Sequence, residues 1–482
     1  MVILELLILI IIGCISLLTG FTDTNKSQFR LSIIGGQDSV EFKHNPVNSS
    51  TLEKVKAPYK PIIEKEIPML NIKSTVPETT QLSFKLPINE SNPTYGNFDL
   101  MTKLTELKDR LNSTKLLLDD YYKKPLFDKI MLKLDPYARL KSTLTRRYNA
   151  QHCTNAWLKY YEIYSRFGVI EKMAETGHIK SFHNAELPGA SICALNHYMK
   201  TNMRQTNFQW FASSLLADDS RALSDLYRLY ECNYDHWLMS DKFKSPKPDV
   251  PVHPCNGDTT ALKNIDYYKS HLNDIVNLYS HDAGIDASSD YNNQEIMNSK
   301  VHLGAALAGL ETLAKGGIFI AKQYTYFAQI TIWLMSKYAE MFEEFYIFKP
   351  LTSRACNSET YFIGLGYQRN DDIIAKLRDL LDNFDAQYDK ITIDDVNDQM
   401  REVIYESAKD IFEQQINCLQ SRYKIYTEIT DTYAREITES PNIVVSMVSN
   451  YSFKAFNPKQ QLWTDQHPVL RINDTDKLKD TC

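Results

Sequence analysis

Segments of strand length alternate with longer helical patterns between residues 179 and 368. The helical patterns place apolar residues at three- and four-residue steps, and glycines or prolines separate them from the short segments. Such alternation predicts an α/β sandwich around a mostly parallel sheet. In this class of fold, ligands bind at the edge where the strands end. We expect strands at 179–185, 207–216, 274–280, 318–324, 345–350 and 360–368, and helices at 190–201, 292–317 and 327–342, the second of which should stop at Gly316 and Gly317.

The flanks of this region are helical or irregular. Residues 98–122 have a helical pattern, residues 139–172 predict one long helix or two, and the chain after 369 is helical and highly charged. Between about 22 and 95 it is polar and interrupted by prolines, which indicates a flexible linker or a loosely draped arm. The chain thus divides into a hydrophobic segment at 1–24, a linker at 25–95, a helical extension at 96–150, an α/β domain at 151–368 and a helical C-terminal region at 369–482.

The first residues of the chain are strongly apolar. Leu6 to Leu18 form an almost unbroken apolar run, and the segment from Val2 to Phe21 is long enough to span a membrane if Glu5 is tolerated. No Lys or Arg precedes the run, which argues against a signal peptide. A membrane anchor is one hypothesis. The alternatives to an anchor are an inserted apolar helix and a start codon placed too far upstream.

Composition and charge narrow the class of protein. The 482 residues suggest roughly two to four domains, and 43% apolar residues provide for a sizeable core. Because the formal net charge is −6, nucleic-acid binding would need a local basic surface, such as Arg139, Lys141, Arg146 and Arg147. The eight cysteines include no CxxC pair and no zinc-like spacing, so we expect reduced thiols rather than a disulfide framework.

Four short segments carry residues suited to chemistry. Gly189 lies in a Pro-Gly turn before a helix, where a ligand can approach the backbone. Asp282 follows an apolar strand, where α/β folds bind ligands. Lys322 lies within an apolar strand, where burial lowers the pKa of a lysine and carboxylates raise it, so it is a candidate general base. Arg354 and Glu359 lie in a polar loop, and Arg354 suits phosphate contact.

Each of these features also has an ordinary structural explanation. The Pro-Gly segment can be a plain turn, the aspartate a helix cap, and the polar loop a simple hairpin. The lysine can lie on an edge strand and extend its ammonium to water. The occurrence of all four features together, in this order, is what indicates a function.

Together, these segments resemble FtsJ-like ribose 2′-O-methyltransferases. The order Lys159, Asp282, Lys322, Glu359 resembles the K-D-K-E tetrad of that family. ELPGAS resembles its cofactor loop, GDTT its GD(I/V)T segment, SHDAGID its ADGG strand end, and KGGIFIAK its GGxFVxK strand. KPLTSRACNSE is similar to the KPxTSRxxNSE stretch of the members that act on mRNA caps, and it is the most specific match.

The resemblance covers residues 150–367, about half of the chain, and implies a Rossmann-like methyltransferase domain at 151–368. The order of the motifs agrees with the predicted strands, because each motif falls at a strand end or a turn. Leu187 and Ala190 depart from the pattern, since many family members carry glycine there. The resemblance therefore implies that the methionine end of the cofactor is held differently.

The resemblance implies S-adenosylmethionine as cofactor and a ribose 2′-hydroxyl, most closely that of the first transcribed nucleotide of capped mRNA, as methyl acceptor. Lys322 would steer or deprotonate the hydroxyl, with Lys159, Asp282 and Glu359 holding it in line. No metal is needed, because a sulfonium is already a good leaving group. The implied cofactor contacts are Glu186, Pro188, Gly189, Asp258 and Asp282, and the implied RNA contacts are Ser353, Arg354, Asn357 and the basic helix at 139–147.

Other interpretations remain open at this point. They are a 2′-O-methyltransferase of ribosomal or transfer RNA, a non-catalytic RNA-binding or scaffold subunit of a capping complex, and a membrane-tethered protein whose fold serves assembly. The abundance of Asn, Tyr, Ile and Lys suggests a large DNA virus with its own capping machinery. We therefore expect a location in the host cytoplasm or the virion, capping or transcription proteins as partners, and membrane contact through residues 2–21.

Overall fold

The computed structural model describes residues 67–87, 98–121, 123–174, 178–204, 207–216, 224–240, 252–272, 276–287 and 290–482, all within one compact unit, Lys65–Cys482. The hydrophobic segment predicted at 1–24 and most of the predicted linker at 25–95 lie outside these residues. No helix within them is long and apolar enough to cross a membrane. The anchor hypothesis concerns residues 2–21, which are not among them.

Seven strands form one mixed sheet in the part of the chain that the structure describes, in the order β1-β6-β7-β5-β4-β2-β3. Their bounds are Leu82–Leu86 (β1), His178–Asn184 (β2), Asn207–Ser213 (β3), Val276–His281 (β4), Leu313–Gln323 (β5), Phe342–Lys349 (β6) and Thr360–Tyr367 (β7). Strands β3, β2, β4 and β5 pair in parallel, whereas β5, β7, β6 and β1 pair antiparallel. The α/β sandwich is confirmed, and parallel pairing is confined to one half of the sheet.

Loop length explains the antiparallel half. Only residues 350–359 join β6 to β7, and parallel neighbours need a crossover of about a dozen residues or more. Strand β7 therefore turns back and inserts between β6 and β5. Strand β1 pairs with β6 at the sheet edge, with Leu82 opposite Lys349. The prediction of a linker throughout 25–95 is thus wrong at β1, because a strand this short has too little alternation to be recognised in a polar stretch.

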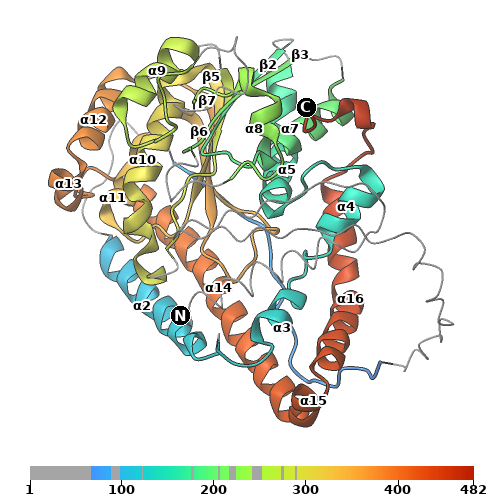
Figure 1. Ribbon diagram of the computed structural model, residues 1–482. Helices are drawn as coiled ribbons and strands as arrows, with labels where there is room; N and C mark the ends of the chain where they lie inside the picture. Colours follow the sequence, from blue (N-terminus) through green and yellow to red (C-terminus); the bar gives the residue numbers. More distant parts are fainter. Residues whose placement is uncertain are drawn as a thin grey trace, which may run out of the picture. The chain divides into compact units, whose positions relative to one another are not determined.

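Helices cover both faces of the sheet (Figure 1). Helices α9 to α12 lie on one side and α5 and α7 on the other, while α14 passes beside β1 and α2. The bounds are Leu100–Asp119 (α2), Phe127–Lys133 (α3), Leu140–Tyr148 (α4), Asn155–Phe167 (α5), Val169–Ala174 (α6), Ala190–Asn202 (α7), Leu229–Cys232 (α8), Leu262–Leu272 (α9), Gln294–Thr312 (α10), Gln329–Ala339 (α11), Asp371–Asp382 (α12), Phe384–Gln387 (α13), Asp398–Thr432 (α14), Ala434–Glu439 (α15) and Pro441–Gln466 (α16). The core lies between these layers and the sheet.

Two predicted helices have different ends in the structure. The helix expected at 292–317 ends at Thr312, because Leu313 is already extended and pairs with Val276 of β4. Gly316 and Gly317 therefore lie within β5 and do not stop the helix. The segment 139–172 forms three helices rather than one or two. Asn149 and Gly168 adopt left-handed conformations that end α4 and α5, as is common at helix C-termini.

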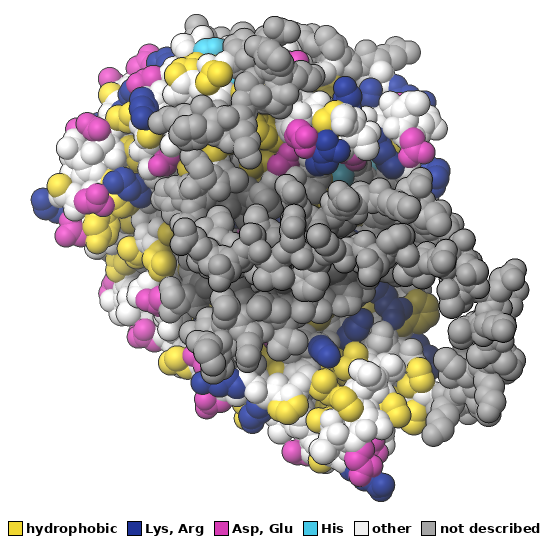
Figure 2. Space-filling model, viewed as in Figure 1, with side chains coloured by type: hydrophobic (Ala, Val, Ile, Leu, Met, Phe, Trp, Pro, Cys, Tyr) yellow, Lys and Arg dark blue, Asp and Glu magenta, His cyan; other side chains and the backbone are white. Residues whose placement is uncertain are grey.

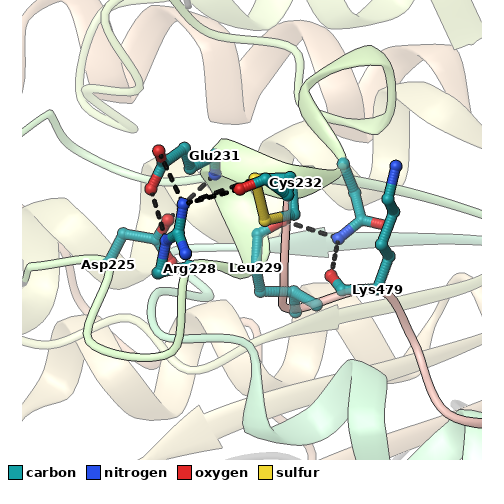
Figure 3. The surroundings of a disulfide bond; sticks show 8 residues. Asp225, Arg228, Leu229, Glu231, Cys232 and Lys479 are labelled. Carbon is teal, nitrogen blue, oxygen red and sulfur yellow. Dashed lines mark hydrogen bonds and ion pairs between the residues drawn. A yellow bond between two sulfur atoms is a disulfide. The ribbon is translucent and has the colours of Figure 1, made fainter. Parts of the chain in front are cut away.

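The prediction of reduced thiols is wrong for four cysteines. Cys232 pairs with Cys482, and Cys356 pairs with Cys418. The first bond fastens the C-terminal tail beside α8, where Asn233 also donates a hydrogen bond to the Lys479 carbonyl (Figure 3). The partners are 250 and 62 residues apart, so no local spacing could reveal them. Among the described cysteines, Cys153, Cys193 and Cys255 are free.

Both disulfides are expected to stabilise the fold. Replacing Cys418 with serine should lower the free energy of unfolding by about 2–4 kcal/mol, because the unfolded chain regains the freedom of the closed loop. Thermal unfolding with and without reductant measures the effect. The variant lacks this bond, so reductant should lower its melting temperature less than that of wild type. Cys153→Ser is the control, since Cys153 is free. Equal melting temperatures for oxidised and reduced wild type would contradict this expectation.

Candidate active site

The sheet topology brings three of the four tetrad residues to one edge. Asp282 directly follows β4, whose last residue, His281, pairs with Ala321 of β5. Lys322 is the next residue of β5. Glu359 directly precedes β7, which runs antiparallel to β5, so its beginning lies at the carboxyl end of β5. Parallel β4 and β5 and antiparallel β7 therefore place these three residues side by side.

Helix α5 supplies the fourth residue, Lys159. The helix begins at a capping residue, Thr154, whose side chain accepts a hydrogen bond from the backbone of Trp157. Its apolar side chains are buried, and the Tyr160 hydroxyl donates to the His281 carbonyl at 2.9 Å. This bond anchors α5 at the end of β4. Lys159, one residue before Tyr160, thereby reaches the same edge of the sheet.

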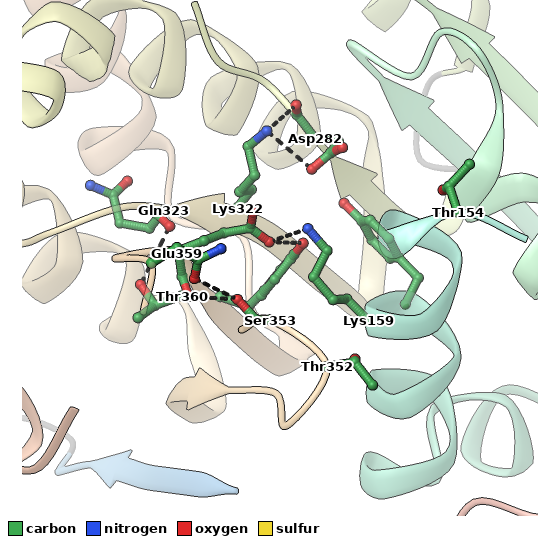
Figure 4. A network of polar contacts seen from close by, with 12 residues as sticks. Thr154, Lys159, Asp282, Lys322, Gln323, Thr352, Ser353, Glu359 and Thr360 are labelled. Carbon is green, nitrogen blue, oxygen red and sulfur yellow. Dashed lines mark hydrogen bonds and ion pairs between the residues drawn. The ribbon is translucent and has the colours of Figure 1, made fainter. Parts of the chain in front are cut away.

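The tetrad forms two pairs (Figure 4). The Lys322 ammonium lies 3.2 Å from Asp282 Oδ1 and donates to the Asp282 carbonyl at 2.7 Å. The Lys159 ammonium is hydrogen-bonded to Glu359 Oε1, which also accepts from the Tyr361 hydroxyl at 2.9 Å. Side-chain exposure is 9% for Lys159, 11% for Lys322, 13% for Glu359 and 27% for Asp282. The site is therefore partly buried and opens beside Asp282.

The charges in this cluster fix the protonation states at neutral pH. Burial raises the pKa of Glu359, but Lys159 and Lys322 outweigh burial and hold it at about 2. Burial lowers the pKa of Lys322, but the carboxylate of Asp282, with Tyr324 and Glu359, outweighs burial and holds it above its usual value. In the free protein the site thus holds a protonated Lys322 and an ionised Glu359.

The segments predicted to bind the cofactor meet at the carboxyl ends of β2 and β3. Gly189 has φ 101° before α7, and Gly257 has φ 80°. A Cβ on Gly257 would lie 1.7 Å from the Ser214 carbonyl oxygen, so only glycine fits there. The Leu187 backbone donates to the Ser214 hydroxyl at 3.3 Å. Leu187 and Gly257 thus both lie against Ser214, which directly follows β3.

The two acidic residues predicted in these segments are already hydrogen-bonded. Glu186 is buried, and its carboxylate accepts from the backbone and the hydroxyl of Ser191 at 2.8 and 2.6 Å. Burial, the main cause, raises its pKa to about 8. Asp258 Oδ1 accepts from the backbone and hydroxyl of Thr260. Both carboxylates therefore shape the backbone of their own segments, and direct contact with a cofactor stays a prediction for them and for Pro188.

Three of the residues predicted to contact RNA lie in loop 350–359, and their side chains differ in exposure to solvent. Ser353 is buried, and its hydroxyl donates to the Glu359 carbonyl at 3.0 Å. Asn357 accepts from Lys349. Arg354 is 39% exposed in its side chain and ion-pairs with Asp135 at 3.1 Å. Of the three, Arg354 presents the most surface to a ligand, and an RNA contact by any of them stays a prediction.

A cavity of about 830 Å³ lies against the tetrad. Tyr324 and Glu359 border it on the tetrad side, and Arg354 borders it from the loop. Lys115 of α2 and Lys123, in the turn after that helix, add two basic groups. Its size suits a nucleotide-sized ligand. On the coloured parts of the surface in Figure 2, Lys and Arg side chains are interspersed with Asp and Glu side chains.

Some residues of this site were not identified from the sequence. Tyr324 and Tyr361 follow Lys322 and Glu359 by two positions, and side chains two apart on an extended chain share a face. That spacing is a signal that could have found them. Lys115 and Lys123 gave no comparable signal, because neither lies next to a tetrad residue in the sequence. The basic helix predicted at 139–147 corresponds to α4, and Arg139 before it donates to the Ser449 hydroxyl at 3.0 Å rather than standing free.

Comparison with known proteins bears on the same region. Residues 153–367 match the FtsJ-like methyltransferase family and form a domain of that kind. The chain is 39% identical over 54% of its length to a probable methyltransferase, EP424R, of African swine fever virus, and it spans 59% of that protein. It is 30% identical over 60% of its length to the cap-specific mRNA (nucleoside-2′-O-)-methyltransferase 2 of Mus musculus, and it spans 36% of that protein. An uncharacterized protein of Acanthamoeba polyphaga mimivirus is 28% identical over 65% of this chain.

Proposed function

We propose that this protein transfers a methyl group from S-adenosylmethionine to a ribose 2′-hydroxyl of capped mRNA, most specifically that of the first transcribed nucleotide. The observation that carries the proposal is the paired arrangement of Lys322 with Asp282 and Lys159 with Glu359 beside a nucleotide-sized cavity. The FtsJ-like domain and the similarity to a viral probable methyltransferase and a mouse cap-specific methyltransferase support it. Two of the relatives are proteins of viruses, which also supports the viral source inferred from composition.

The residues of the site fit such a cofactor. When bound, S-adenosylmethionine supplies a methyl group on a sulfonium cation. A carboxylate beside the cofactor favours a cation, and Asp282 has the most exposed side chain of the tetrad. Gly284 keeps room beside the lysine, because a Cβ there would lie 3.4 Å from Lys322 Nζ and 2.7 Å from the Tyr324 hydroxyl. Residues 186–189, 257–258 and 282–284 would therefore hold the cofactor at the ends of β2, β3 and β4.

The chemistry of the chain is positioning and proton transfer. Lys322 faces the open side of the site, where its nitrogen can hold the 2′-hydroxyl and accept its proton. Asp282 keeps Lys322 in place through two contacts. The Lys159–Glu359 pair forms the opposite wall and is locked by Tyr361. Because Lys322 rests as an ammonium, it must lose a proton before it can act as the base.

This requirement predicts a rate that rises with pH. With both substrates below saturation, the methyl-transfer rate should increase by about one log unit per pH unit between about pH 6 and 9, since the raised pKa of Lys322 lies above that range. In Asp282→Asn, the residual activity should begin to rise at lower pH, because the carboxylate that most raises the Lys322 pKa is gone. A flat profile in wild type would mean that Lys322 only orients the hydroxyl as an ammonium.

The RNA would lie across the cavity edge. Arg354, Lys115 and Lys123 can contact phosphates, which position RNA without reading its sequence. Lys141 of α4 lies near Arg354. Burial, followed by the positive charge of Arg354, lowers the pKa of Lys141. The basic helix α4 therefore lies near the loop, although none of its residues lines the cavity. We place the activity in the host cytoplasm or the virion, with capping or transcription proteins as partners.

A methyl-transfer assay tests the proposal. Labelled S-adenosylmethionine is incubated with the full chain and three RNAs of equal length: a capped RNA, the same RNA without a cap, and a ribosomal RNA fragment. Label on the capped RNA alone, mapped by nuclease digestion to the first ribose, supports the proposal. Label on the ribosomal fragment would instead support a ribosomal RNA enzyme. Binding of capped RNA without any label would support a scaffold subunit.

A further inference from the structure

Lys349, the last residue of β6, is a buried lysine whose contacts all lie in one loop. It is 2% exposed. Its ammonium donates to the Asn357 carbonyl and side-chain oxygen, both at 2.8 Å, and to the Glu359 carbonyl at 2.7 Å. The Ser353 hydroxyl lies 3.3 Å away. One cation thus holds the middle and the end of loop 350–359.

This lysine makes no ion pair with any described carboxylate. Burial, above all, lowers its pKa to about 7; Glu359 opposes the shift and Lys159 adds to it. Glu359 and Lys159 are the charged groups that face Lys349. The ammonium bonds the backbone carbonyl of Glu359 rather than its carboxylate, and it does not bond Lys159. A buried cation without a paired carboxylate is costly to keep. Four oxygens of loop 350–359 surround the ammonium instead, so its contacts serve to hold the loop.

The other end of the loop is held by a second buried charge. Glu162, on α5 one turn after Lys159, accepts from the Leu351 backbone at 2.7 Å and from the Thr352 hydroxyl at 2.8 Å. The Trp463 indole of α16 also donates to it, at 3.1 Å. Helix α5 thus fixes the start of the loop through Glu162 and binds the carboxylate at its end through Lys159. Between these two points, Lys349 sets the path of the backbone.

We propose that Lys349 is a positioning residue for methyl transfer, because its ammonium fixes residues 353–359 so that the Glu359 carboxylate meets Lys159 at the tetrad. The inference rests on the proposed function of the site. Lys349 does not reach the cavity or the tetrad carboxylates, so its effect passes through the loop. Loss of these bonds releases the Glu359 backbone, and displacement of a catalytic wall by about 1 Å can cost about 100-fold in rate.

The test is Lys349→Met, which keeps the length of the side chain and removes its donors. We expect kcat on capped RNA to fall by about 100-fold, while the Kd for S-adenosylmethionine changes less than about twofold, because residues 186–189 and 257–258 do not contact the loop. Hydrogen–deuterium exchange of residues 350–359 should increase. Lys337→Met is the matched control: Lys337 of α11 is also buried, but it pairs with Glu340 directly after that helix and with Asp395 in the segment before α14. It should keep its kcat.

A milder variant keeps the proposal testable if Lys349→Met does not fold. Ser353→Ala removes one ligand of Lys349 and the bond to the Glu359 carbonyl, and it should lower kcat several-fold. The inference is wrong if either folded variant keeps a kcat within about twofold of wild type. It is also wrong if Lys337→Met loses as much kcat as Lys349→Met at equal melting temperature. If wild type itself methylates no RNA, the proposed function fails instead, and the two failures are thereby distinguished.

Discussion

Lys322→Ala is expected to lower the rate of methyl transfer by about 10²–10⁴-fold, the range typical for loss of a general acid–base group. The ammonium of Lys322 contacts both the carboxylate and the carbonyl of Asp282 and faces the open side of the site. Alanine leaves no group there to hold the 2′-hydroxyl or take its proton. Single-turnover transfer of labelled methyl to capped RNA measures the rate of this step without product release.

The control for this variant is Lys315→Ala, because Lys315 lies on the same strand, β5, and is exposed. Both proteins should melt close to wild type or, for Lys322→Ala, a little lower, since Asp282 is partly exposed and can be hydrated. The Kd for S-adenosylmethionine should change far less than the rate. An active Lys322→Ala protein would remove this residue from the mechanism, and an inactive Lys315→Ala protein would show that the loss is not specific to the tetrad.

Glu359→Gln is expected to cost about 3–5 kcal/mol of folding free energy, because it leaves the Lys159 ammonium buried without its carboxylate. The folded-state pKa of Glu359 is about 2, below its usual value of 4.5, so its stabilisation is complete above pH 4.5 and is lost as the pH falls towards 2. The difference in melting temperature between wild type and variant should therefore shrink below pH 4.5. Chemical denaturation at pH 7 measures the free energy directly.

The double variant Lys159→Met, Glu359→Gln separates folding from function. With both charges removed, most of the stability lost in Glu359→Gln should return, whereas methyl transfer should stay low because the wall opposite Lys322 is gone. Glu344→Gln is the control: the Lys85–Glu344 pair is exposed, and its loss should cost less than about 1 kcal/mol. A Glu359→Gln protein as stable as wild type would show that the Lys159–Glu359 pair does not stabilise the fold.

Sequence patterns located most elements of the α/β domain, because burial imposes periods that neighbouring residues record. Strands β2, β4 and β7 lie within one or two residues of the predicted segments. The order of Asp282, Lys322 and Glu359 was also readable, since each stands at a strand end or within an apolar strand. The end of α10 at Thr312 was not readable from the sequence. Leu313 pairs with Val276, so β5 begins before Gly316 and Gly317, the glycines that were predicted to stop the helix.

What the sequence determined by itself is the identity and order of the chemical groups and the local turns that carry them. The tertiary structure alone decided which groups meet: Lys159 pairs with Glu359 across 200 residues, Cys232 with Cys482 across 250, and Lys349 with its own following loop rather than with a carboxylate. Such contacts depend on how the strands assemble into the sheet and on which polar groups are buried away from water. No short segment of the chain contains this information. A lysine can therefore act as a base, as Lys322 would, pair with a carboxylate, as Lys159 does, or hold a loop, as Lys349 does, according to the groups around it.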